Sequence, residues 1–128
     1  MFDTSVLVAA LVKPHPLHER AVSWLKRAKT GEVVMAISAH TLAEIYAVLT
    51  TLPVSPRISP DMAWRLIHEN IEKTATVISM DGADYIETIL RLKERGFSGG
   101  IVYDALIFYA AVKSKAETLL TLSLLQKS

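Results

Sequence analysis

The sequence predicts an α/β fold organised around a parallel sheet, and two observations lead to this expectation. Short runs of β-branched and aliphatic residues alternate along the chain with longer segments whose apolar residues recur at helical spacing. The longer segments have the length of crossover connections between parallel strands. The chain has 128 residues, of which 51% are hydrophobic, so it can bury one continuous core. We expect a single domain spanning residues 1–128.

The expected elements follow the chain in a simple order. They are a very short strand at residues 1–2, a polar turn at 3–5, helices over 6–11 and 18–29, a strand over 33–37, a helix that follows Ser38, a helix that begins at Ser59, a strand over 74–79, a helix from Asp81 to Gly96, a helix over 99–112 and a strand over 118–122. The strand over 33–37 is continuous and apolar, as expected of a strand that is covered on both faces. Ile86, Ile89 and Leu90 are expected to face the core.

Composition narrows the classes of function. The formal net charge is +1, so no strong basic field indicates nucleic acid, although a local basic patch could still bind it. The chain has no cysteine, so metal chemistry here would use oxygen or histidine ligands. Asp3 interrupts the apolar start and no basic segment precedes it, which argues against a signal peptide. The run over 101–112 is too short for a membrane span. We expect a cytoplasmic protein.

The most apolar segment, residues 99–112, carries a single charge at Asp104. Its apolar residues are too many for one stripe, which predicts a mostly buried helix. A lone buried carboxylate is costly unless it is paired or neutralised, and no basic residue lies within one helical turn. The partner is then a group from another segment, for which a divalent cation held by further carboxylates is one candidate. The alternative is an acid near a helix start, favoured by the helix dipole.

Two further acids follow predicted strands. Asp3 ends the first strand and Glu44 lies just beyond the second, so both should face the rim formed by the carboxyl ends of parallel strands. Each acid also has a purely structural interpretation. Asp3 could cap the helix that it precedes, and the run from Thr41 to Glu44 matches a capping box. Asp104 could reach the same rim if the loop containing Gly99 crosses the sheet.

Three motifs together resemble a PIN domain, most closely the VapC-type toxins of bacterial toxin–antitoxin pairs. They are Asp3-Thr4-Ser5-Val6-Leu7-Val8, Leu42-Ala43-Glu44-Ile45-Tyr46 and the run from Gly99 to Ile107. The resemblance covers essentially the whole chain. It implies a PIN-like α/β/α sandwich with a central parallel sheet of four strands, or five.

The resemblance also implies a metal-dependent endoribonuclease. Asp3 and Asp104 would bind one or two Mg²⁺ or Mn²⁺ ions directly, and Glu44 would bind directly or through water. The hydroxyl groups of Thr4 and Ser5 would orient the carboxylate of Asp3. The implied partners are an RNA substrate, a cognate antitoxin protein and a second copy of the chain.

One departure from the family pattern concerns the last strand. Ser123 stands two residues after Thr121, where the family usually carries a further acid or an asparagine. A serine can hold a metal-bound water but adds no negative charge, so a catalytically silent PIN-like module that binds RNA or protein is the main alternative. A haloacid-dehalogenase-like phosphatase would need a second aspartate at the position of Ser5.

The remaining polar and aromatic residues support function only weakly. Basic residues on helix surfaces could line a phosphate track, or form an ordinary solvated face: Lys13, Arg20, Lys26, Arg27, Arg91, Lys93, Arg95, Lys113 and Lys115. The four histidines have no metal-ligand spacing, which argues against a zinc site. Trp24 and Trp64 stand among aliphatic residues at helical spacing and are expected in the core or an interface.

Overall fold

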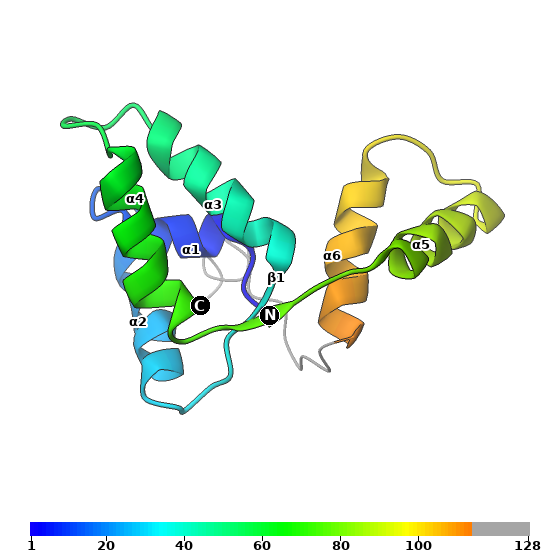
Figure 1. Ribbon diagram of the computed structural model, residues 1–128, viewed down its shortest axis with the longest axis horizontal. Helices are drawn as coiled ribbons and strands as arrows, with labels where there is room; N and C mark the ends of the chain where they lie inside the picture. The colour runs from blue at the N-terminus through cyan, green and yellow to red at the C-terminus, as the bar shows by residue number, and fades with distance from the viewer. Residues whose placement is uncertain (114–128) are drawn as a thin grey trace.

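The computed structural model describes residues 1–113 (Figure 1). Its elements are α1 (Thr4–Leu11), α2 (His18–Lys29), β1 (Ala36–Ser38), α3 (Ala39–Thr51), α4 (Pro60–Ile67), the π-helical turn η1 (His68–Glu72), β2 (Thr76–Ile78), α5 (Gly82–Glu94) and α6 (Ile101–Lys113). The expected alternation of helices with short strands is therefore present. The strand predicted over 118–122 lies outside the described residues.

The sheet of the described residues is a parallel pair, β1 and β2, with Ile37 opposite Val77. The backbone N–H of Thr76 donates to the carbonyl of Met35, and that of Phe2 donates to the carbonyl of Ala36. Since successive carbonyls of a strand point to opposite edges, β1 lies between β2 and the amino-terminal residues. The α/β class and the parallel pairing are confirmed, whereas the sheet of four or five strands stays a prediction.

Helices cover both faces of β1, because its side chains alternate between two apolar clusters. Ile37 is fully buried in the larger cluster, which α1, α2, α3 and α4 build, and Ala36 packs with Ala110 of α6 and with Met1 in the smaller one. Figure 1 shows the same division, with α1 to α4 on one side of the strands and α5 and α6 on the other.

The larger cluster holds α1 and α3 in place against each other. Leu7 of α1, Ile45 and Leu49 of α3, and Ile71 of η1 are fully buried within it. α1 contacts both α2 and α3, so the short first helix lies at the centre of this half of the molecule. Burial of side chains of this size contributes about 1.5–3 kcal/mol each. The amino-terminal ends of α1 and α3 are therefore held by well-packed side chains.

Local sequence signals predicted several helix starts correctly. The hydroxyl group of Ser59 caps α4 by accepting from the backbone N–H of Met62, and Pro60 occupies the first turn. Asp81 caps α5 and forms a reciprocal capping box with Asp84. Gly96 has a φ of 72°, as expected where a helix ends with a left-handed residue.

The strand predicted over 33–37 begins later, at Ala36. The backbone N–H groups of Glu32 and Val33 donate to the carbonyl of Arg27, so this part of the chain wraps the end of α2. Val34 is 77% exposed as a result and is not covered on either face. The β-branched run correctly predicted a strand, but the hydrogen bonds to α2 keep residues 33–35 out of it.

Two expectations of burial are wrong for the described residues. α6 buries only Ala110, while Asp104, Tyr103 and Phe108 are exposed. On α5, the expected inward residues Ile86, Ile89 and Leu90 are exposed as well. The described strands are three residues long and cover only a small part of these helices, which is why an apolar sequence does not imply burial here. No helix among residues 1–113 has the length and hydropathy that crossing a bilayer requires.

Candidate functional site

Asp3 acts as the N-cap of α1 and is already oriented by two donors. Its Oδ1 atom accepts from the backbone N–H of Val6 at 3.1 Å and from the hydroxyl group of Ser5 at 2.8 Å. The capping interpretation is therefore correct, but capping occupies only one oxygen atom of the carboxylate. Both bonds end on Oδ1, and no described residue donates to Oδ2. Asp3 can cap the helix and still offer an oxygen atom to a ligand.

Glu44 is not part of a capping box. The N-cap of α3 is Ser38, three residues before Thr41, so Glu44 lies in the second turn of α3 rather than in the first. Its Oε1 atom accepts from the hydroxyl group of Thr4 at 3.2 Å and lies 3.9 Å from Nε2 of His40. The Glu44 side chain is 41% exposed. The predicted capping box is wrong because α3 begins three residues earlier than that motif requires.

The Thr4 hydroxyl group was expected to orient Asp3, and it donates to Glu44 instead. Only Ser5, of the two predicted hydroxyl groups, donates to Asp3. This correction links the two acids. Thr4 directly follows Asp3, so a bond from Thr4 to Glu44 holds the start of α1 beside α3. The structure thus brings two of the three predicted acids into one neighbourhood, although they are 41 positions apart along the chain.

Asp104 lies in the first turn of α6 and is exposed. Among residues 1–113, no three Asp, Glu or His side chains come close enough together to hold a metal ion. Asp104 does not line the cavity that Glu44 lines, but Ile107, three residues further along α6, does, so Asp104 adjoins the cavity-lining part of the helix surface. The first turn of α6 therefore faces the part of α3 that carries Glu44.

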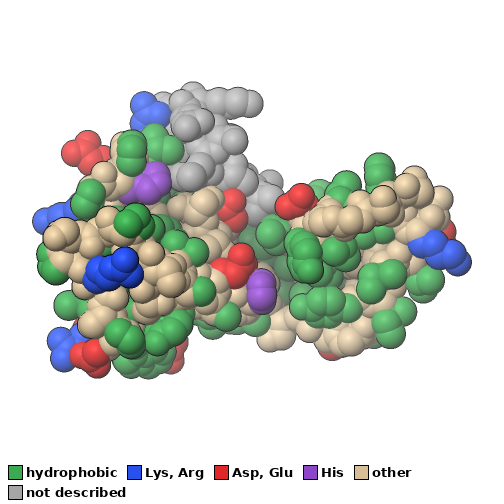
Figure 2. All heavy atoms as spheres, turned by 90° about the horizontal axis from the view of Figure 1, so that it is seen from above, with side chains coloured by type: hydrophobic (Ala, Val, Ile, Leu, Met, Phe, Trp, Pro, Cys, Tyr) green, Lys and Arg blue, Asp and Glu red, His purple; other side chains and the backbone are tan. Residues whose placement is uncertain are grey.

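The cavity between α3 and the two last described helices has a volume of about 180 Å³. Its lining combines polar groups from the start of α3 with tyrosines and aliphatic residues from the other side: Ser38, His40, Thr41, Glu44, Met80, Tyr85, Tyr103, Leu106 and Ile107. Figure 2 shows a hollow between the two sides of the molecule, with acidic side chains at both edges and apolar side chains of the α5–α6 side across it. We call this space the tyrosine cavity.

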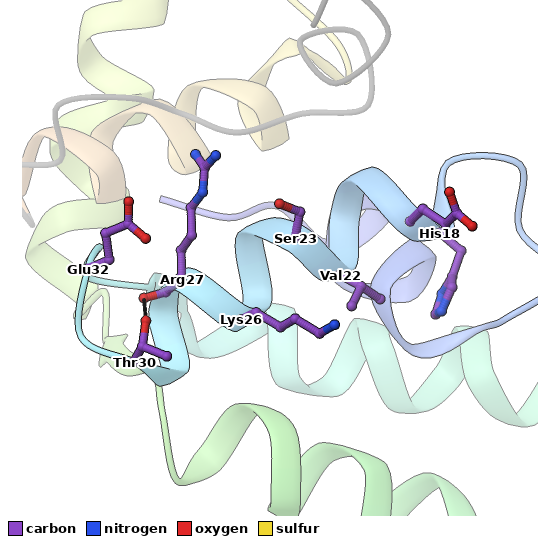
Figure 3. Close-up of a pocket in the computed structure, with 8 residues that line it drawn as sticks. His18, Val22, Ser23, Lys26, Arg27, Thr30 and Glu32 are labelled. Atoms are coloured by element: carbon purple, nitrogen blue, oxygen red, sulfur yellow. Dashed lines mark hydrogen bonds between the residues drawn. The ribbon is translucent and has the colours of Figure 1, made fainter.

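A larger and shallower groove of about 720 Å³ follows α2, away from these acids. Figure 3 shows that Arg27 and Lys26 point to different sides of this groove, and that Glu32 lies on the side of Arg27. Its charges are of both signs and do not converge. Of the two spaces, only the smaller tyrosine cavity is lined by one of the three predicted acids, Glu44.

Several of the predicted basic residues already have partners. Arg27 lies over the ring of Trp24, Arg91 pairs with Glu87, and Lys113 pairs with Asp84. A phosphate track stays a prediction, and Lys115 lies outside the described residues. Trp24 packs against the core as expected, whereas Trp64 is 52% exposed and stacks on His68.

The donor set suits a hard divalent cation. Asp3 and Glu44 offer carboxylate oxygen atoms, and a thiolate ligand is excluded because the chain has no cysteine. Mg²⁺ and Mn²⁺ prefer such oxygen ligands, and Mg²⁺ is commonly held by only one or two protein carboxylates. The chemistry of the residues present therefore fits such an ion. Ser123, predicted to hold metal-bound water, lies outside the described residues.

Sequence comparisons identify the family of the chain. The chain belongs to the PIN domain family, since the model of that family matches residues 1–122. Within the family it is of the VapC type. It is 36% identical to Ribonuclease VapC27 of Mycobacterium tuberculosis H37Rv over 115 residues, which are 90% of this chain and 78% of that protein. It is 34% identical to Ribonuclease VapC40 of the CDC 1551 strain over 117 residues, which are 91% of this chain and 81% of that protein.

Sequence reasoning missed three residues of the site, His40, Tyr85 and Tyr103. His40 stands four residues before Glu44, and this i, i+4 spacing could have placed both on one helix face. No local signal indicates that Tyr85 of α5 and Tyr103 of α6 share a cavity with α3.

Proposed function

We propose that this chain is a metal-dependent endoribonuclease, the toxin component of a type II toxin–antitoxin system, which hydrolyses RNA phosphodiester bonds. The observation that carries the proposal is the Thr4–Glu44 hydrogen bond, which holds Glu44 beside the helix start that Asp3 caps. Membership of the PIN domain family and the likeness to two proteins named as ribonucleases support the same conclusion.

In this proposal Asp3 and Asp104 hold the Mg²⁺ or Mn²⁺ ion, and Glu44 holds it directly or through water. Held by these residues, such an ion would activate a water molecule for attack and offset negative charge on the phosphoryl group. Ser5 keeps the Asp3 carboxylate in one orientation, and Thr4 does the same for Glu44. Because carboxylates repel phosphate, RNA binding at this site also depends on the ion.

The experiment that tests the proposal incubates the purified chain with mixed RNA, with and without Mg²⁺ or Mn²⁺. The variants Asp3→Asn and Asp104→Asn are compared with Asp61→Asn, a matched change at an acid on α4 that pairs with Arg65. We expect EDTA to abolish cleavage, each of the first two variants to lower kcat/KM at least about a hundredfold, equal to about 2.7 kcal/mol, and the control to be unchanged. Cleavage that ignores the metal and both substitutions contradicts the proposal.

A catalytically silent PIN-like module is the second candidate. The observation that favours it is the lack of a group of three metal-binding side chains among the described residues. It predicts RNA binding without cleavage at any concentration of Mg²⁺ or Mn²⁺. The same incubation separates the two candidates, provided that folding is checked by circular dichroism.

We propose further that residues 1–128 form one domain, that this domain acts in the cytoplasm, where its RNA substrate is found, and that it binds a cognate antitoxin protein and pairs with a second copy. Exposed apolar side chains on α5 and α6 support the pairing, among them Ile86, Ile89, Phe108 and Val112 in the described part of the chain. Exposed apolar side chains that gather into a patch are typical of protein interfaces.

A further inference from the structure

We propose that the tyrosine cavity binds one unpaired base of the RNA substrate, next to the phosphodiester bond that is cleaved. This inference rests on the proposed ribonuclease activity and assigns a recognition role to residues outside the acidic motifs. The cavity is bounded by His40 and Glu44 of α3 on one side and by Tyr85 and Tyr103 on the other. Glu44 lines the cavity and is also a proposed ligand of the ion, so a base in the cavity would lie next to the proposed metal site.

The two tyrosines offer aromatic surface that the protein itself does not use. Tyr103 is 71% exposed and Tyr85 is 43% exposed, although both line a cavity. Neither hydroxyl group bonds to any residue of the described chain, in contrast to Tyr109, whose hydroxyl group donates to Glu87. Exposed aromatic rings beside a nucleic-acid site are typical platforms for base stacking, because every base presents a π face.

The opposite side of the cavity carries hydrogen-bonding groups. Ser38 is the N-cap of α3, yet its hydroxyl group makes no capping bond and is available to another partner. His40 offers a donor and an acceptor nitrogen when neutral, and its side chain is 71% exposed. Such groups can read the edge of a base whose face lies on an aromatic ring. The combination therefore suits a base better than an aliphatic ligand.

The size of the cavity and the charge of Glu44 narrow the class of ligand further. The volume of about 180 Å³ is below the range of about 300–1,000 Å³ that is typical of pockets for drug-sized ligands, so the cavity suits a flat ring better than a complete nucleotide. The sugar and phosphate would stay outside. A phosphate group inside the cavity would also meet the Glu44 carboxylate, whereas an uncharged base would not. Only a single-stranded or looped RNA can offer a base in this way.

The test measures binding of short single-stranded RNA to the chain by fluorescence anisotropy in Mg²⁺, with phosphorothioate linkages in the RNA that resist metal-dependent hydrolysis. We expect Tyr103→Ala to raise Kd about tenfold, equal to about 1.4 kcal/mol, within the range for loss of one stacked base. Tyr103→Phe should bind like the wild type, because it keeps the ring. Tyr46→Ala, at a tyrosine that is also 43% exposed but lies outside the cavity, is the matched control and should leave Kd unchanged.

A second arm uses the same RNA with abasic positions. Its binding should be weaker, and Tyr103→Ala should weaken it no further. Tyr85→Ala repeats the measurement on the other helix, in case Tyr103→Ala does not fold. Unchanged Kd values for both alanine variants, or equal sensitivity of the abasic RNA, would overturn the inference. The inference would also be overturned if the tyrosine variants bound RNA normally and lost binding to a partner protein instead.

The two proposals fail separately. If Asp3→Asn abolishes cleavage while the tyrosine variants bind RNA normally, only the base-binding cavity is refuted. If the tyrosine variants lose RNA binding but Asp3→Asn cleaves like the wild type, the catalytic proposal is refuted and the cavity stands.

Discussion

The hydrogen bond from Thr4 to Glu44 offers the sharpest test of how the site is assembled. Thr4→Val removes the hydroxyl group with little change of shape, whereas Thr4→Ser keeps it. A hydrogen bond to a charged group contributes about 1.5–3 kcal/mol when it is shielded from water. The Glu44 side chain is 41% exposed and the bond is 3.2 Å long, so water replaces part of what is lost. We therefore expect about 1 kcal/mol, below the range for charged partners and typical of hydrogen bonds in proteins.

Two assays measure this effect. Urea unfolding should show the free energy of unfolding of Thr4→Val lowered by about 1 kcal/mol with an unchanged slope. Metal-dependent RNA cleavage should show kcat/KM lowered about fivefold, if the same free energy is lost in the transition state. Thr4→Ser should resemble the wild type in both assays.

Thr50→Val is the matched control, because Thr50 also donates its hydroxyl proton within the protein, to the backbone carbonyl of Tyr46 on α3. It should leave cleavage unchanged. The reasoning is refuted if Thr4→Val and Thr50→Val have the same effect on kcat/KM, because the bond to Glu44 would then have no special role.

Two further predictions concern α5 and α6. The Lys113 ammonium group lowers the pKa of Asp84 below its usual value of 3.8, and Asp84 raises the pKa of Lys113 above 10.5. Their mutual stabilisation should therefore be fully present between about pH 4 and pH 10 and be lost gradually as the pH falls through the lowered pKa of Asp84 or rises through the raised pKa of Lys113. Lys113→Met should lower Tm slightly at pH 7 and by a smaller amount at pH 2 in thermal scans; an equal effect at both values would exclude the pair as the cause. Ile89→Glu places a charge on the exposed apolar face of α5 and should shift the chain from dimer to monomer in sedimentation equilibrium, while a chain that is monomeric before the change would contradict the proposed pairing.

Local patterns were reliable wherever the physical cause was local. The helix starts at Ser59 and Asp81 follow from side-chain caps that act within three residues, and these predictions are confirmed. The capping box at Glu44 failed because the motif alone does not say where a helix begins. Ser38 and the end of β1 place that start three residues earlier.

Burial was harder to predict because it depends on what covers an element. The apolar sequence of α6 indicated a buried helix, yet Ala110 is its only buried residue in the described structure. A hydrophobic pattern states which residues could be covered, and the area of the sheet decides how many are. The same reasoning applies to Ile86 and Ile89 of α5.

The sequence by itself determined the α/β class, the order of the elements and the three candidate acids, because periodicity, caps and residue chemistry are written in neighbouring positions. Only the tertiary structure decided that Thr4 bonds to Glu44, 40 positions away, and that two tyrosines of α5 and α6 share a cavity with α3. These contacts arise from the packing of α1 against α3 and of α6 against β1. No local pattern encodes them, since each depends on how several helices share one core.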